Sequence, residues 1–196
     1  MATIQRLWST KRRFRILAAI FGVALIYLLP FLAMPGFAAI YLKLEGIDGE
    51  STSLAFPKMI QVDSVQWGSG RGISMPKAGG DREVSAASVS EINLSKPMDK
   101  ASLPIFREAV AGQTGKAATI YFTSTAGGGQ ETAYYEITLS DVLVSSFSQG
   151  SGGDRPSESL SLNFTKIALK YTPQGAEGKS GTAINASYDL TTGKAQ

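Results

Sequence analysis

The residues whose spacing comes nearest to a known chemical motif are a glycine, a lysine and a serine close to the end of the chain. Gly178, Lys179 and Ser180 match the last three positions of a phosphate-binding P-loop, in which backbone amides and the lysine bind nucleotide phosphates. That motif needs another glycine five positions before Gly178, where this chain has Pro173, and it needs a helix to follow. Residues 181–183 do not favour the start of a helix, so the sequence argues against nucleotide binding.

Two other groups of residues are weaker candidates for a binding site. The glycine-rich stretch Gly68–Gly72 lacks the spacing and the context of a dinucleotide-binding loop, and we interpret it as part of an exposed loop. Asp48 and Glu50 could bind calcium, but no third carboxylate stands at EF-hand spacing, which favours a turn. A carboxylate pair for glycoside hydrolysis stays open, although nothing distinguishes one pair from another.

The chain contains neither histidine nor cysteine. This excludes catalysis by an imidazole base or a thiol nucleophile, and it also excludes disulfides and cysteine-rich zinc sites. Asn93, Asn163 and Asn185 each begin the pattern Asn-X-Ser/Thr, but two of these patterns fall inside predicted strands and we interpret them as chance. We therefore predict no catalytic, cofactor-binding or metal-binding residue, and a protein that is not an enzyme.

The element marked most clearly in the sequence is a long strand that bends. Residues 151–156 have the composition of a turn, with adjacent glycines and a proline. Apolar residues then alternate with polar ones in two runs that are one register apart, namely Leu160, Leu162 and Phe164, then Ile167, Leu169 and Tyr171. The slip predicts a bulge or bend near Thr165–Lys166, of the kind that curls a sheet into a barrel.

Most of the remaining chain after residue 39 is also predicted to be strand. The expected strands are 40–44, 59–67, 83–94, 117–125, 132–139, 142–147 and 184–190. Residues 126–130 are rich in glycine and predict a hairpin turn. The stretch Gly68–Asp81 contains too much glycine and proline for a strand, so we predict a long exposed loop there.

A single helix is predicted in the body, over Asp99–Val110. Its apolar side chains recur at helical spacing, Asp99 is the expected cap, and Gly112 follows its end. Many short strands with one helix predict an all-β sandwich or small barrel. Its predicted core includes Val62, Val65, Leu162 and Phe164.

The start of the chain differs from the rest in charge and hydropathy. Five of the 19 basic residues come before residue 16, whereas all 16 acidic residues come after residue 39. Once the first 38 residues are set aside, 14 basic and 16 acidic residues remain. The body is therefore slightly acidic, which argues against a nucleic-acid partner.

The basic start precedes the apolar run Ile16–Leu29, which Pro30 and Pro35 end. As a helix this run measures about 21 Å at ~1.5 Å per residue, less than the ~30 Å of a membrane core. We predict that residues 1–38 are a secretory signal peptide cleaved before Ala39. An uncleaved membrane anchor and true initiation near Met34 are the alternatives.

From Ala39 onward the sequence resembles the haemolysin-coregulated protein (Hcp) family, the tube proteins of bacterial type VI secretion. The resemblance covers essentially the whole body and is least evident at the turn Gly127–Gln130. It is carried by Ala39–Ser51, Val65–Ser74, Ser88–Ser102, Gly152–Lys179 and Tyr188-Asp189-Leu190.

This resemblance implies an Hcp-like β-barrel over residues 39–196 that assembles into hexameric rings. The rings would stack into a tube that leaves the cell and carries or chaperones effectors, and the loop Gly68–Asp81 would reach a neighbouring subunit or ring. The expected partners are further copies of the chain, secretion effectors and other type VI components.

The leader is a departure from the resemblance, because tube proteins of this family usually begin near the residue that corresponds to Ala39. It leaves a second hypothesis open, an exported or membrane-tethered Hcp-like binding module that acts outside the cytoplasm. A secreted, extracellular location is expected. A periplasmic or membrane-tethered location, with residues 1–38 as the contact with the membrane, is the alternative if the leader is retained.

Overall fold

The computed structural model describes residues 38–75, 80–125, 129–175 and 180–196, so the predicted leader, apart from its last residue, lies outside the described residues. Internal contacts divide the chain into residues 1–35 and residues 36–196, and the description that follows concerns the second of these units. Within the described residues, no helix is both long enough and apolar enough to cross a membrane.

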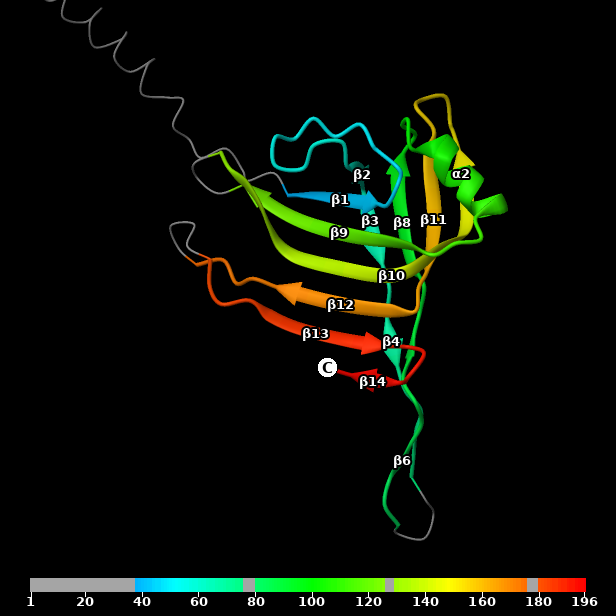
Figure 1. Cartoon of the computed structure of the whole chain (residues 1–196), viewed down its shortest axis with the longest axis vertical. Helices are drawn as coiled ribbons and strands as arrows, with labels where there is room; N and C mark the ends of the chain where they lie inside the picture. The colour runs from blue at the N-terminus through cyan, green and yellow to red at the C-terminus, as the bar shows by residue number, and fades with distance from the viewer. Residues whose placement is uncertain (1–37, 76–79, 126–128, 176–179) are drawn as a thin grey trace, which may run out of the picture. The chain divides into compact units, whose positions relative to one another are not determined.

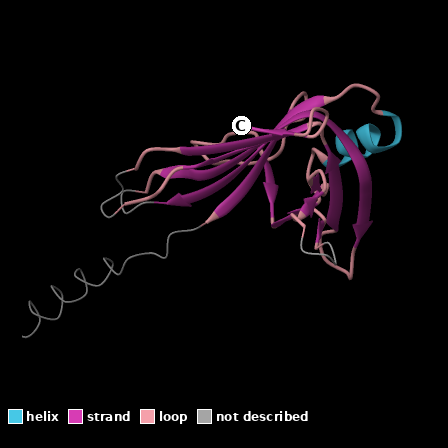
Figure 2. Cartoon of the chain, turned by 90° about the horizontal axis from the view of Figure 1, so that it is seen from below, coloured by secondary structure: helices cyan, strands magenta, loops and turns pink. Residues whose placement is uncertain are grey.

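The described part of the chain is mainly β, with one helix, α2 (Ser102–Ala111), as Figures 1 and 2 show. The strands are β1 (Ala39–Leu44), β2 (Ile60–Val62), β3 (Ser64–Gln66), β4 (Ser69–Gly70), β5 (Ile73–Ser74), β6 (Glu83–Val84), β7 (Ser88–Val89), β8 (Ile92–Pro97), β9 (Lys116–Thr125), β10 (Glu131–Gly150), β11 (Ser157–Asn163), β12 (Lys166–Tyr171), β13 (Ile184–Asp189) and β14 (Lys194–Ala195). The predicted fold class, mainly β with one helix in the body, is confirmed.

The longer strands form a large sheet and a smaller sheet that share β10. The order is β2-β1-β9-β10-β12-β13-β14 in the large sheet and β10-β11-β8-β3 in the small one. Only Asp63 separates β2, at the edge of the large sheet, from β3, at the edge of the small one. The two sheets are therefore joined at two corners, which produces the barrel-like arrangement that the sequence predicts.

The strand that bends through the fold is β10. Its first part pairs with β9 and β12, and from Leu143 onward it pairs with β11. The register slips between Leu139 and Val142 and again between Val144 and Ser146, and Asp141 has a φ of 55°. The prediction of separate strands at 132–139 and 142–147 is therefore wrong, because the irregular residues between them bend one continuous strand.

The predicted bend near Thr165–Lys166 is a break between two strands. β11 ends at Asn163 and β12 begins at Lys166, and the two pair with different parts of β10. The register slip was thus placed correctly, but it marks a chain that leaves one sheet and enters the other. Similarly, the predicted strand at 59–67 is divided at Asp63 into β2 and β3.

The segment predicted to be a loop, Gly68–Asp81, contributes one side of a ribbon, and its residues 76–79 lie outside the described residues. β4 pairs with β7 and β5 pairs with β6, although each of these strands has only two residues. The predicted strand at 83–94 supplies the other side of the ribbon and then the start of β8. The loop prediction holds for the other described residues of the segment and for their exposure, but it missed β4 and β5, because exposed ladder pairing tolerates glycine and serine.

The helix begins three residues later than predicted. Asp99 does not cap it; instead its Oδ1 accepts a hydrogen bond from the Ala101 amide at 3.0 Å. Gly112 ends the helix, as predicted, with its amide donating to the Glu108 carbonyl. Among the apolar residues at helical spacing, Ile105 is fully buried, whereas Phe106 and Val110 are 47% and 64% exposed.

The core lies between the two sheets and beneath α2. The predicted core residues Val62, Leu162 and Phe164 are buried and Val65 packs against them, which confirms that prediction. Side chains with no exposed surface come from both sheets and from the helix, including Leu42, Ile60, Ile92, Ile105, Ile120, Ile137, Leu139, Leu160 and Leu162. This single core fixes the position of α2 against the sheets.

A buried ion pair lies where α2 begins. Lys96 on β8 and Glu158 on β11 are cross-strand partners, their side chains are fully buried, and Lys96 Nζ is 2.7 Å from Glu158 Oε2. Lys96 Nζ also lies 2.7 Å from Asp99 Oδ1 and donates to Ser102 Oγ at 3.1 Å. Ser102 Oγ donates to Glu158 Oε2 at 2.8 Å, so this Lys96–Glu158 cluster fastens the first turn of the helix to the sheet.

Replacing Lys96 with Met should destabilise the fold strongly, because Glu158 would keep a buried charge without its cation. We expect a loss of about 3–5 kcal/mol in the free energy of unfolding, measured by urea denaturation. The control is Lys170→Met at the exposed pair with Glu136, where less than about 1 kcal/mol should be lost. Equal losses in the two variants would show that the buried pair does not hold the fold.

Candidate assembly surfaces

The residues singled out for chemistry do not come together in the described part of the chain, where no three carboxylate, histidine or cysteine side chains are grouped to hold a metal ion. Glu50 accepts a hydrogen bond from the Lys100 amide at 3.0 Å and pairs with Arg155 at 3.3 Å, whereas Asp48 is exposed. Gly178 and Lys179 lie outside the described residues, and the strand β13 follows Ser180 where a P-loop would need a helix.

The three Asn-X-Ser/Thr patterns all begin within strands, with Asn93 in β8, Asn163 at the end of β11 and Asn185 in β13. Two of these asparagines are tied into cross-strand hydrogen bonds. Asn93 Oδ1 accepts from Ser161 Oγ at 2.6 Å, and Asn163 Nδ2 donates to Glu91 Oε1 at 3.0 Å. These two side chains therefore help to hold neighbouring segments of the small sheet together.

A carboxylate that the sequence did not single out, Glu131, collects three hydroxyl donors. Ser53 Oγ donates to it at 2.6 Å, Thr123 Oγ1 at 2.6 Å, and the Tyr41 hydroxyl at 3.4 Å. Burial acts to raise the pKa of Glu131, but these hydrogen bonds outweigh it and hold the pKa below its ordinary value. Such a carboxylate is a weak base near neutral pH and is poorly suited to accept a proton in catalysis. Because Ser53 lies in the connection between β1 and β2, the cluster instead attaches that connection to the large sheet.

The paired strands β4–β7 and β5–β6 form a two-stranded ribbon that extends away from the sheets (Figure 1), and we call its described residues, 68–75 and 80–90, the hairpin. Two hydrogen bonds between Gly72 and Ser85 link the two sides of the hairpin. The Gly72 amide donates to Ser85 Oγ at 2.8 Å, and the Ser85 amide donates to the Gly72 carbonyl at 2.9 Å. Three apolar side chains on the hairpin are about half exposed or more, namely Ile73 (57%), Met75 (71%) and Val84 (49%).

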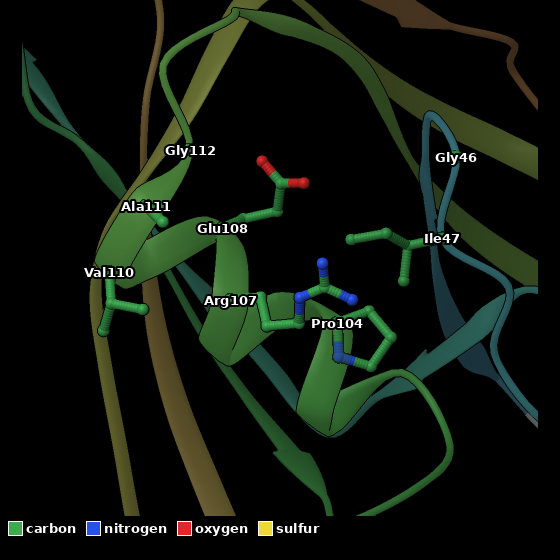
Figure 3. A pocket seen from close by; sticks show the side chains of 8 residues that line it. All are labelled: Gly46, Ile47, Pro104, Arg107, Glu108, Val110, Ala111 and Gly112. Atoms are coloured by element: carbon green, nitrogen blue, oxygen red, sulfur yellow. The ribbon is translucent and has the colours of Figure 1, made fainter.

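The outward face of α2 is the second exposed apolar surface. Leu103 and Val110 are 68% and 64% exposed, and Phe106 is half exposed while its ring edge packs on Phe147 at 5.9 Å between centroids. Beside this face is a cleft of about 440 Å³ between the helix and the turn at Gly46 and Ile47. Figure 3 shows Arg107 projecting from the helix toward that turn.

The third surface lies at the end of the large sheet that is away from α2. There a row of side chains runs across five strands in register, from Ile40 on β1 through Phe122 and Tyr135 to Tyr171 on β12 and Ile184 on β13. Tyr171 and Ile184 are 45% and 63% exposed. We call these five residues the apolar row. Together, the three surfaces suit binding to another protein, and none of them groups residues for catalysis.

Comparison with known proteins gives consistent similarities. Residues 41–171 match the family described as "Type VI secretion system effector, Hcp". The protein Hcp1 of Pseudomonas aeruginosa is 32% identical to this chain over 105 residues, which are 52% of this chain and 64% of that protein. The match thus spans slightly less than two thirds of that relative's length.

Solved structures resemble the body along its length. A structure of a type six secretion system protein has a TM-score of 0.75 at 30% identity and covers 82% of this chain and 100% of its own. Hcp1 from Salmonella typhimurium has a TM-score of 0.66 at 25% identity, with 83% and 100% covered. A type VI secretion system effector from Yersinia pestis has a TM-score of 0.59 at 25% identity, with 76% and 98% covered.

Proposed function

The chain belongs to the Hcp family of type VI secretion proteins, and we propose that it is a tube-building subunit that forms closed rings of six copies. The rings stack, and the tube carries or chaperones secreted effectors. The role is structural and not enzymatic, the protein itself is the main partner, and effectors and other type VI components are the further partners. A slightly acidic body makes nucleic acid an unsuitable partner.

The observation that carries this proposal is the hairpin. Ordering a chain costs about 1–2 kcal/mol per residue, and a ribbon with exposed Ile73, Met75 and Val84 buries little apolar surface within its own subunit. A neighbouring copy offsets that cost by covering those side chains or by pairing with the free backbone groups. The hairpin is thus a contact between subunits or between rings.

A second candidate function rests on the start of the sequence. The basic residues and the apolar run within residues 1–38 favour export of the chain across the membrane. In this alternative the same fold is an exported or membrane-tethered binding module that acts outside the cytoplasm. Both candidates place the body in the secreted, extracellular fraction if the leader is removed.

Residues 39–196 should run as closed hexamers in native mass spectrometry at micromolar concentration, because neighbouring copies can cover the exposed apolar surfaces. The matched control is the same protein in mild denaturant, where monomers should dominate. A protein that stays strictly monomeric without denaturant would contradict the ring assignment.

Shortening the hairpin should weaken assembly and leave the barrel folded. The change replaces residues 69–79 with a tight turn, while the core residues Val62, Val65, Leu162 and Phe164 lie outside the deleted part. Circular dichroism should be unchanged, and sedimentation at matched protein concentration should show smaller particles. Equal sedimentation of the shortened and full-length proteins would show that the hairpin is not an interface.

The protein recovered from native cells should begin at Ala39, because Pro35 and the small residues before Ala39 fit a signal-peptidase site. Mass spectrometry of the intact chain measures this directly. An intact Met1 in the membrane fraction would support the tethered alternative, and a start at Met34 would place true initiation there.

A further inference from the structure

We propose that the rings close head to tail, with the outward face of α2 in one copy packed on the apolar row of the next copy. This inference rests on the proposed function, since it names the surfaces by which neighbouring subunits of a ring meet. The two surfaces are the row Ile40, Phe122, Tyr135, Tyr171 and Ile184, and the helix residues Leu103, Phe106, Arg107 and Val110.

The apolar row continues the core face of the large sheet beyond the part that is covered. Side chains two residues apart on a strand share a face, and the residues two positions along β1, β9 and β10 are Leu42, Ile120 and Ile137, all with no exposed surface. Exposure rises along the row, from partly buried Ile40, Phe122 and Tyr135 to 63% at Ile184. The row is therefore core surface that the described part of its own subunit covers only in part.

The helix face has the same character but carries one cation. Ile105 and Ser102 are buried against the sheet, so Leu103, Phe106 and Val110 point outward on the other side of the helix. Arg107 lies at the edge of this face beside the cleft, and its guanidinium makes no hydrogen bond or ion pair with any residue that the structure describes. A partner for this face should thus offer apolar side chains and a group that attracts a guanidinium.

The apolar row meets both requirements. Phe122, Tyr135 and Tyr171 supply ring faces, and an arginine over a tyrosine ring is attracted by the ring's negative face. Tyr135 and Phe122 already pack together with ring centroids 5.2 Å apart, which makes this part of the row a firm surface. Aromatic residues and arginine are also the types that contribute most to binding at protein interfaces.

The positions of the two surfaces determine the kind of contact. Figure 1 shows α2 near one end of the strands of the large sheet and the far ends of β12 and β13 at the other, and Figure 2 likewise shows the helix at one end of the strands. One copy cannot bring its own helix to its own row, and a symmetric contact between two rows would leave both helices exposed. A head-to-tail contact covers both surfaces in every copy, and such heterologous contacts close into rings when the rotation permits.

The chain has no cysteine, so introduced cysteines report this contact without interference. In the full chain we pair a cysteine at Leu103 or Val110 with one at Tyr171 or Ile184, giving four double variants, and treat them with a short bismaleimide. All four positions are exposed, so the fold should tolerate them. The controls are the single variants and Val110→Cys paired with Leu54→Cys, since Leu54 is fully exposed and belongs to neither surface.

At least one double variant should give covalent chains of three to six subunits on a denaturing gel, whereas the controls should give dimers at most. Native mass spectrometry of the same samples separates the possible failures. Assembled rings in which none of the four pairs cross-links would overturn this contact and leave the proposed function standing. Failure of every variant and of the unsubstituted protein to assemble would overturn the proposed function, and this inference with it.

A pair of charge substitutions gives a second readout. Ile184→Glu and Val110→Glu each place a charge at the proposed contact, so each should weaken assembly on the order of tenfold or more. Leu54→Glu, at a side chain that is 101% exposed, should have little effect. Equal assembly of all three variants would contradict the proposal, because a buried contact does not accept an unpaired carboxylate.

Discussion

One buried ion pair fastens the first turn of α2 to the sheet, and the outward face of α2 is one of the three exposed apolar surfaces. Lys96 and Glu158 face each other across β8 and β11 with no exposed surface, and Ser102 joins them from the first turn of the helix. Removing two charges from water is costly, and the cost is recovered only when every polar atom is bonded. Here the Ser102 hydroxyl, the Asp99 carboxylate and the Gln149 amide complete the bonding. The start of the helix therefore has a defined position, and its outward face has a defined direction.

The second constraint is the unequal size of the two sheets. β10 serves both of them, and its bulges and the positive φ at Asp141 let one strand leave the large sheet and continue in the small one. The small sheet and the helix cover only part of the large sheet's inner face, and the apolar row lies on the remainder. We propose that the chain self-assembles because a neighbouring copy covers the apolar row and so completes the core.

Local patterns in the sequence predicted the class of fold and many of its elements. Alternation through Leu160 and Leu162 marks β11, whose inward side chains at these positions have no exposed surface, and helical spacing marks α2. The pattern could not show that β10 is continuous, because Ser140 and Asp141 resemble a turn until their partners are known. It could not show that Lys96 and Glu158 are buried either, since charged residues in strands usually face water.

The candidate surfaces were still less accessible to sequence reasoning. Phe106 and Val110 have the spacing of core residues, yet they point outward, because core and interface use the same side chains. The apolar row exists only through the register of five strands that are distant in the sequence. Of the three surfaces, the sequence predicted exposure only for the hairpin, because of its glycines, and it did not predict that the strands of the hairpin pair.

Electron cryomicroscopy of the assembled protein would show directly which surfaces meet at each subunit boundary. We expect a closed ring in which α2 of every subunit lies on the apolar row of its neighbour, with Arg107 close to Tyr135 or Tyr171. A ring in which α2 faces solvent while another element covers the row, or particles that are only monomers, would contradict it.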